Sequence, residues 1–253
     1  MNIYVRLVYR NLRANLDRAS LFFELIFPLF FIFVQGPAIG GTGLTLNLGG
    51  KVVGYAEYLA TGAVTLTVIN GGTNAGTQLW FDRKNGMFEQ LLMAPLTRAQ
   101  YILSIILATL IIGVVGSLLV FAFAFPVVGA AIALTIQGQI FIAAALFLGT
   151  VFFGSFAITV SVALRSSETF QVVSTFAFFI FLFTSSVFFP TGSAPLAIQI
   201  VSLGNPLTYT TDVFRAGIFD ALTPLVSLEL TILAVEALAM FIVAVLAFRR
   251  IRV

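Results

Sequence analysis

Long apolar runs separated by short polar stretches dominate the hydrophobic pattern of this chain. A helix needs about 20 mainly apolar residues to cross the hydrocarbon core of a bilayer, so each long run predicts a membrane-spanning helix. The pattern therefore predicts an all-α membrane protein with six transmembrane helices, in which residues 1–253 form a single transmembrane domain. The predicted spans are residues 20–39, 55–81, 101–125, 139–164, 169–189 and 226–248.

Basic side chains indicate how these spans are oriented. If both termini are cytoplasmic, only Lys51 and Arg215 of the 13 Lys and Arg residues lie outside. Basic residues concentrate in cytoplasmic loops, and the opposite orientation would invert the ratio. We therefore expect a multi-pass protein of the inner or plasma membrane with both termini in the cytoplasm. The cytoplasmic basic residues are Arg6, Arg10, Arg13, Arg18, Arg83, Lys84, Arg98, Arg165, Arg249, Arg250 and Arg252.

Residues 1–19 are predicted to form an interfacial helix that lies along the membrane surface. Arg6, Arg10 and Arg13 fall on one side of a helix, and an apolar stripe that includes Val5 and Val8 runs beside them. A basic tail that only fixes topology is the alternative. A cleaved signal peptide is disfavoured because the polar region extends to about residue 19 and Glu24 interrupts the apolar run.

Composition narrows the chemistry that this chain can perform. Hydrophobic residues make up 60% of the sequence and charged residues 9%, with no Cys and no His. The absence of Cys excludes disulfides and thiolate ligands, and the absence of His removes the commonest general base and metal ligand. We expect no metal site, and the net charge of +3 reflects topology and not nucleic-acid binding.

Residues 82–98, between the second and third spans, form the densest polar stretch of the chain. On a helical wheel Met87, Phe88, Leu91 and Leu92 share one face. Asn85 suits the N-cap of such a helix and Pro95 its end. The pattern predicts a short amphipathic helix, and periodicity alone leaves open whether its apolar face contacts lipid or a protein groove.

The same stretch resembles the cytoplasmic loop of the permease subunits of ABC-type exporters. The resemblance is to the type-2 family, which includes drug-resistance, nodulation and polysaccharide exporters. A second similar region spans residues 188–219, so the resemblance covers nearly the whole chain. The matching positions in the loop, with the pattern R-x-x-G-x-x-E-x-L-L-x-x-P-x-x-R, are Arg83, Gly86, Glu89, Leu91, Leu92, Pro95 and Arg98. Those in the second region include Pro190, Pro195, Asn205, Pro206, Leu207, Tyr209 and Arg215.

This resemblance implies that the loop carries a coupling helix, which docks into a groove of a separate ABC ATPase subunit. A second permease is also implied, either as a homodimer or as a heterodimer with a similar chain. The chain itself contains no G-x-x-x-x-G-K-[ST] motif. We therefore expect no bound cofactor and no enzymatic activity here, with ATP and Mg used by the partner. The ATPase-coupling residues would be Arg83, Gly86, Met87, Phe88, Glu89, Leu91, Leu92, Pro95 and Arg98.

Residues 190–225, on the outer side, are too interrupted for a span. Pro195, Gly204, Pro206 and Pro224 divide them into two short helices at about 196–203 and 207–219. They resemble the outer re-entrant helices of the same family. An ordinary surface loop is the alternative.

Polar groups inside the spans are candidates for the transport pathway or for helix interfaces. Asn70, Gly72, Asn74 and Gly76 lie in the second span, where Gly72 and Gly76 form a G-x-x-x-G pattern. Glu236 lies near the middle of the sixth span, where a carboxyl group must be paired, protonated or hydrated. Packing and pathway roles both remain open for these residues.

Together these features predict the permease of an exporter that moves a lipid, drug or glycan-type substrate outward. An ion-coupled secondary transporter or channel is the alternative from a different class. No internal repeat between the two halves of the sequence supports it. A membrane-embedded enzyme lacks the usual catalytic groups. The sequence does not identify the substrate.

Overall fold

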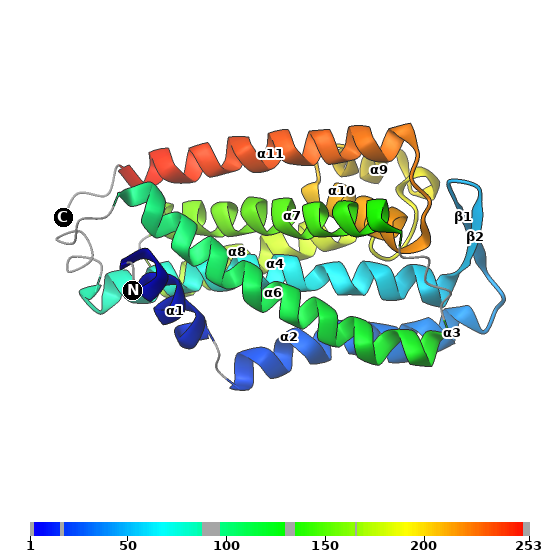
Figure 1. Cartoon of the computed structure of the whole chain (residues 1–253), viewed down its shortest axis with the longest axis horizontal. Coiled ribbons are helices and arrows are strands. Elements are labelled where there is room, and N and C mark those ends of the chain that lie inside the picture. The colour runs from blue at the N-terminus through cyan, green and yellow to red at the C-terminus, as the bar shows by residue number, and fades with distance from the viewer. Residues whose placement is uncertain (1–2, 16–17, 88–96, 130–134, 165, 250–253) are drawn as a thin grey trace.

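The computed structural model describes residues 3–15, 18–87, 97–129, 135–164 and 166–249 as a helical bundle (Figure 1). Its long helices run alongside one another, and a small hairpin projects from one end. In chain order the elements are α1 (Ile3–Asn15), α2 (Arg18–Phe30), a π-helix (Phe31–Gln35), α3 (Gly36–Gly40), β1 (Thr45–Leu48), β2 (Lys51–Gly54), α4 (Tyr55–Lys84), α6 (Arg98–Val128), α7 (Ile136–Ala163), α8 (Ser167–Phe183), a 3₁₀ turn (Thr191–Ser193), α9 (Leu196–Ser202), α10 (Pro206–Phe219) and α11 (Pro224–Arg249).

Three helices of the described part are long and apolar enough to cross a bilayer. They cover Ala99–Pro126, Ile136–Ala163 and Pro224–Arg249, while Glu24–Gly40 and Ser167–Phe183 form shorter apolar helices. The all-α architecture is thereby confirmed, apart from the hairpin. The second predicted span corresponds to α4, a single helix of 30 residues that includes the polar stretch around Asn74.

The first predicted span is a helix that changes its winding midway. Pro28 lies inside α2, and the chain passes through the π-helix into α3. Proline lacks an N–H group and clashes with the preceding turn, and such sites are where helices kink or widen. The wider turn lets the chain continue to Gly40.

The hairpin was not predicted from the sequence. β1 and β2 pair antiparallel, with Leu48 opposite Lys51 and only Gly49 and Gly50 in the loop. Both glycines have positive φ, 56° and 90°, as a two-residue hairpin turn requires. The Gly-Gly pair was therefore the available signal for this turn.

The fifth span is shorter than predicted, because α8 ends at Phe183 and not at residue 189. Residues 184–189 are irregular, and Ser185, Ser186 and Val187 are buried. The carbonyl of Val187 fits against Gly62 of α4, where a Cβ would collide with it. Irregular backbone at membrane depth is tolerated when protein buries it.

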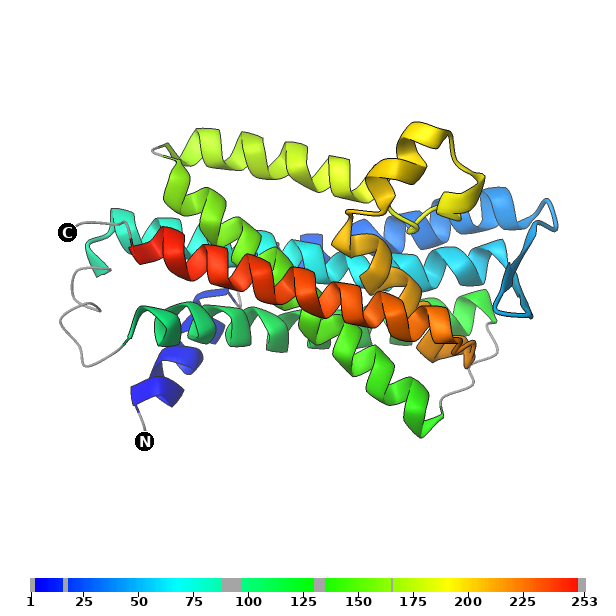
Figure 2. The ribbon, with the colours of Figure 1, turned by 90° about the horizontal axis from the view of Figure 1, so that it is seen from above.

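Figure 2 shows the other long helices gathered along α4 and α7, and α4 packs most extensively against α7. A Cβ on Gly72 would lie 2.5 Å from Cβ of Phe153, and one on Gly76 would lie 2.7 Å from the carbonyl oxygen of Ala157. Only glycine lets the two backbones approach this closely. The G-x-x-x-G pattern therefore forms a helix contact within the chain.

Gly72→Ala should lower the stability of the bundle, because the added methyl group has no space. Overpacking a well-packed site typically costs about 1–3 kcal/mol. Thermal unfolding of the purified protein in detergent measures the effect. Gly113→Ala in α6 is the matched control, since its nearest contact is an ordinary 3.8 Å. Equal melting temperatures for the two variants would contradict the tight contact.

Candidate functional site

A cluster of polar side chains joins α1, α4 and α6 where α4 ends and α6 begins. We call it the Asp82 cluster. Asp82 accepts hydrogen bonds from Arg10 and from the hydroxyl group of Tyr101, the latter at 2.6 Å. Asn11, wholly buried, donates to Ser104 at 3.1 Å and accepts from Arg10. The members are Arg10, Asn11, Asn15, Gln78, Asp82, Tyr101 and Ser104.

Gln78 binds α1 to α4 one turn before Asp82. Its amide donates to Asn11 at 2.7 Å and its carbonyl accepts from Asn15. The amides thus satisfy one another, which a buried polar group requires. Because Gln78 and Asp82 are four residues apart, they lie on one face of α4.

Helix α1 therefore has a protein-facing side that the sequence interpretation missed. Leu7 and Asn11 are buried against the bundle, while Val5 of the predicted apolar stripe is exposed. The apolar and basic residues indicated an amphipathic helix. They did not indicate that a polar residue, Asn11, would attach this helix to the bundle.

The last turn of α4 is also fixed to α7. Arg83, one of the predicted coupling residues, donates from Nη1 to the carbonyl oxygen of Ser161 at 2.9 Å. Asn85 then ends α4 as its C-cap, whereas the sequence predicted it as the N-cap of the next helix. Gly86 follows at φ +67° with no atom near its Cβ position. Glycine tolerates this positive φ, which is strained for residues with a side chain.

Helix α6 begins with a capping box. The hydroxyl group of Thr97 accepts from the backbone of Gln100 at 3.2 Å, and the Gln100 side chain accepts from the backbone of Thr97 at 2.9 Å. This arrangement satisfies helix-end donors and fixes where the helix starts. Arg98, the last residue of the loop motif, is the first residue of α6.

The remaining coupling residues fall partly outside the described structure. Met87 is 39% exposed. Residues 88–96 are not described, so the predictions for five positions stay predictions. They concern Phe88, Glu89, Leu91, Leu92 and Pro95.

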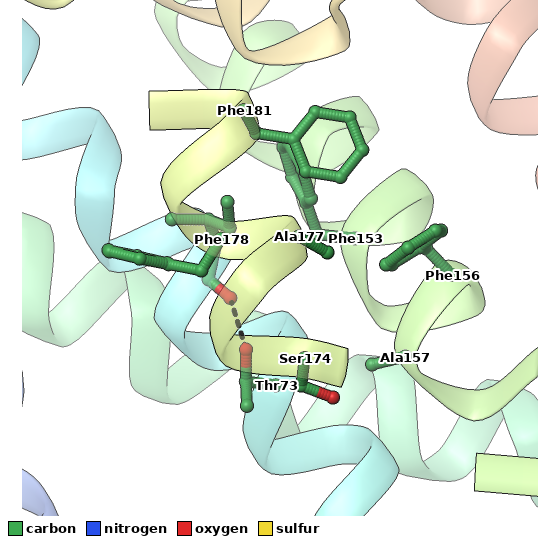
Figure 3. A pocket seen from close by; sticks show the side chains of 9 residues that line it. Thr73, Phe153, Phe156, Ala157, Ser174, Ala177, Phe178 and Phe181 are labelled. Atoms are coloured by element: carbon green, nitrogen blue, oxygen red, sulfur yellow. Dashed lines mark hydrogen bonds between the residues drawn. The ribbon is translucent and has the colours of Figure 1, made fainter. Parts of the chain in front are cut away.

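A small crevice lies between α4, α7 and α8, and its lining includes Thr73 of α4 but none of the four predicted pathway residues of that helix. Gly72 and Gly76 pack on α7 as described, and Asn70 and Asn74 are half-buried. Figure 3 shows Thr73 and Ser174 at one end of the crevice and phenylalanines at the other. Its free volume is about 10 Å³, which admits at most one water molecule. A pathway role for these four residues stays a prediction.

Glu236 is half-buried in α11, and one of its carboxylate oxygens has no hydrogen-bond partner in the described part of the chain. Glu24 of α2 is buried at 3% exposure, and both of its carboxylate oxygens lack such a partner there. Sequence interpretation had used Glu24 only to argue against a signal peptide. Neither residue lies in the Asp82 cluster.

Arg215 occupies a second polar centre, at the opposite end of α4. It is 1% exposed, although the sequence placed it among the outer loops. Its guanidinium donates to Asp212 at 2.9 Å, to Thr61 at 3.1 Å and to the carbonyl oxygens of Tyr58 and Ser186. It also lies 3.5 Å from the centre of the Tyr58 ring. This ion pair fixes α10 inside the bundle.

Comparison with known proteins identifies the family. Residues 4–219 match the ABC-2 type transporter family, so the chain belongs to that family. It is a membrane permease domain without catalytic activity of its own, and permeases of this family work with ABC ATPase subunits. No curated protein matches the chain.

Arg10→Gln and Asp82→Asn should destabilise the protein less than additively when combined. Residues in one hydrogen-bonded network show coupling energies of about 0.5–3 kcal/mol. Equilibrium unfolding of the two single variants and the double variant measures this coupling. The exposed pair Lys51 and Asp220, 3.5 Å apart, is the control and should couple by only about 0–1 kcal/mol. Additive effects at Arg10 and Asp82 would show that the Asp82 cluster is not a stabilising unit.

Proposed function

We propose that this chain is the transmembrane permease of an ABC exporter, which moves a lipid, drug or glycan-type substrate outward. In this proposal it has six spans, an interfacial α1, a coupling helix within residues 82–98 and outer re-entrant helices at α9 and α10. Two permeases assemble, as a homodimer or with a similar chain. A separate ATPase subunit binds ATP and Mg and supplies the energy.

The observation that carries this proposal is the rigid attachment of both sides of the loop. Asp82 and Arg83 fix the end of α4 to α1, α6 and α7, and Thr97 fixes the start of α6. A loop that only connects two helices does not need these side-chain contacts at its ends. Because these contacts join the loop to several helices, a displacement of the loop would move those helices together, as in a rigid-body transition.

The proposed cycle follows from this attachment. When the ATPase subunits move on binding ATP, they displace the coupling helix. Since α4 ends at the Asp82 cluster, the displacement passes to α1 and α6 through hydrogen bonds and to α7 through Arg83. Tight packing at Gly72 and Gly76 then makes α4 and α7 move as one body. The substrate pathway opens where the two permeases meet.

The two basic residues assigned to the outer side, Lys51 and Arg215, both lie at the hairpin end of the bundle. Lys51 lies 3.5 Å from Asp220, and Arg215 lies 2.9 Å from Asp212. Each of these positive charges therefore has an acidic neighbour at the hairpin end. Arg10, Arg83 and Arg249 lie at the other end of the bundle, and it is this uneven distribution of Lys and Arg that favours a cytoplasmic location for that end.

Leu92→Asp should abolish transport and weaken co-purification with the ATPase subunit, because it places a charge in the proposed docking face. Export is measured in inside-out vesicles with and without ATP. Loss should exceed about tenfold, since an unpaired charge in an interface costs several kcal/mol.

Leu196→Asp is the matched control, an apolar-to-acidic change at a position 71% exposed near the hairpin end. It should keep ATPase binding. Retained binding and unchanged export in Leu92→Asp would defeat the coupling-helix assignment. Wild-type export that needs an ion gradient but no ATP would instead favour a secondary transporter.

Single cysteines test the proposed topology cleanly, because the native chain has none. An impermeant thiol reagent added to intact cells should label cysteines at Gly50 and Ser193 but not at Asn85 or Val253. Permeabilised cells, in which all sites are reachable, provide the control. Labelling of the Asn85 variant in intact cells would reverse the orientation and remove the proposed ATPase contact.

A further inference from the structure

A cavity of about 410 Å³ opens at the hairpin end of the bundle, at the opposite end of α4 from the Asp82 cluster. Sites for small molecules typically measure about 300–1,000 Å³. Its walls come from β1 and the hairpin turn, from residues 190–192, from α10 and from the first turns of α11. Among the residues that line it, Asp212, Arg215 and Glu229 carry charge.

The positive charge of Arg215 is already paired within the chain. Its guanidinium makes four hydrogen bonds within the chain, and one face of the Tyr58 ring lies against it. Little donor capacity therefore remains for a ligand. An anion would also meet two carboxylates, so the cavity does not suit one.

Asp212 and Glu229 contribute acceptors that remain available. Oδ1 of Asp212 accepts from Arg215 and from the hydroxyl group of Ser186 at 2.7 Å, yet the side chain stays 29% exposed. Glu229 accepts no hydrogen bond from any residue that the structure describes. The described part of the lining has one arginine and two carboxyl groups, so it carries one excess negative charge when both carboxyl groups are ionised. A ligand must supply positive charge and hydrogen-bond donors.

Two kinds of cation fit poorly. Within the described residues no three His, Cys, Asp or Glu side chains gather closely enough to hold a metal ion. A quaternary ammonium group has no N–H and is bound by aromatic faces. Among the described residues that line the cavity, Tyr58 is the only aromatic one, and Arg215 already lies over its ring.

We propose that this cavity binds a primary or secondary ammonium group, which donates N–H bonds to Glu229 and to the exposed part of Asp212. Such charge-assisted bonds are stronger than bonds between neutral groups. The ammonium group belongs either to a soluble amine or to the headgroup of an aminophospholipid. The site does not depend on the ATPase, so it can be tested on the permease alone.

The test uses the purified permease in nanodiscs of phosphatidylcholine. Saturation-transfer NMR at pH 7 measures binding of ethanolamine and of choline, its quaternary analogue. Ethanolamine should bind and choline should not. In Glu229→Gln, which keeps the shape of the side chain, ethanolamine should bind roughly tenfold more weakly, because a charge-assisted hydrogen bond is replaced by a neutral one.

Glu168→Gln is the charge-matched control, because Glu168 lies in the first turn of α8 and does not line the cavity. It should bind ethanolamine like the wild type. Asp212→Asn is avoided because it would leave Arg215 without its counter-charge. Nanodiscs that contain phosphatidylethanolamine distinguish a lipid headgroup from a soluble amine. If this lipid competes with ethanolamine, the site binds the lipid headgroup; if the lipid does not compete, the site binds soluble amines. Equal binding of choline, no binding of ethanolamine, or unchanged binding in Glu229→Gln would overturn the proposal.

Discussion

The close contact between α4 and α7 at Gly72 and Gly76 is the constraint on which the rest of the structure depends. It holds the most polar of the long helices inside the bundle without a side chain between the two backbones. Because α4 is fixed there, its two ends are fixed as well. One end supplies Gln78 and Asp82, and the other supplies Tyr58 and Thr61.

The Asp82 cluster and the Arg215 centre are therefore both attached to one helix, α4. Tyr58 and Asp82 are 24 residues apart, which corresponds to about 36 Å along a helix that rises 1.5 Å per residue. A displacement of the Asp82 end along the axis of α4 reaches the Arg215 pair unless the helix bends. Rigid secondary elements with anchored ends are one physical route by which distant sites influence each other.

Elements marked by local chemistry could be predicted from the sequence. Pro195 and Pro206 bounded α9 and α10 correctly to within a residue, because proline restricts where a helix can start. Three of the six predicted spans correspond to helices that are long and apolar enough to cross a bilayer, and the loop motif indicated the family. The end of α8 was misplaced because Val187, Phe188 and Phe189 prolong the apolar run beyond the polar residues 184–186. The contact between Val187 and Gly62 that holds this segment in an irregular form depends on tertiary structure.

Features made by contacts between distant residues could not be predicted in this way. Arg215 was placed on the outer side without partners, because Tyr58 and Thr61 lie more than 150 positions earlier in the chain. Asn11 and Ser104 meet only after folding. The docking face of the proposed coupling helix was predicted from sequence alone, and it stays a prediction because residues 88–96 are not described.

The burial of Arg215 also has a consequence for how the chain is synthesised. A charged side chain placed alone in hydrocarbon is costly, so Arg215 needs its partners when α10 enters the bundle. Tyr58, Thr61, Ser186 and Asp212 all precede it in the sequence. Translation runs from the N-terminus, so these four partners are synthesised before Arg215. The order of translation allows α10 to dock as soon as it emerges, before α11 closes over it.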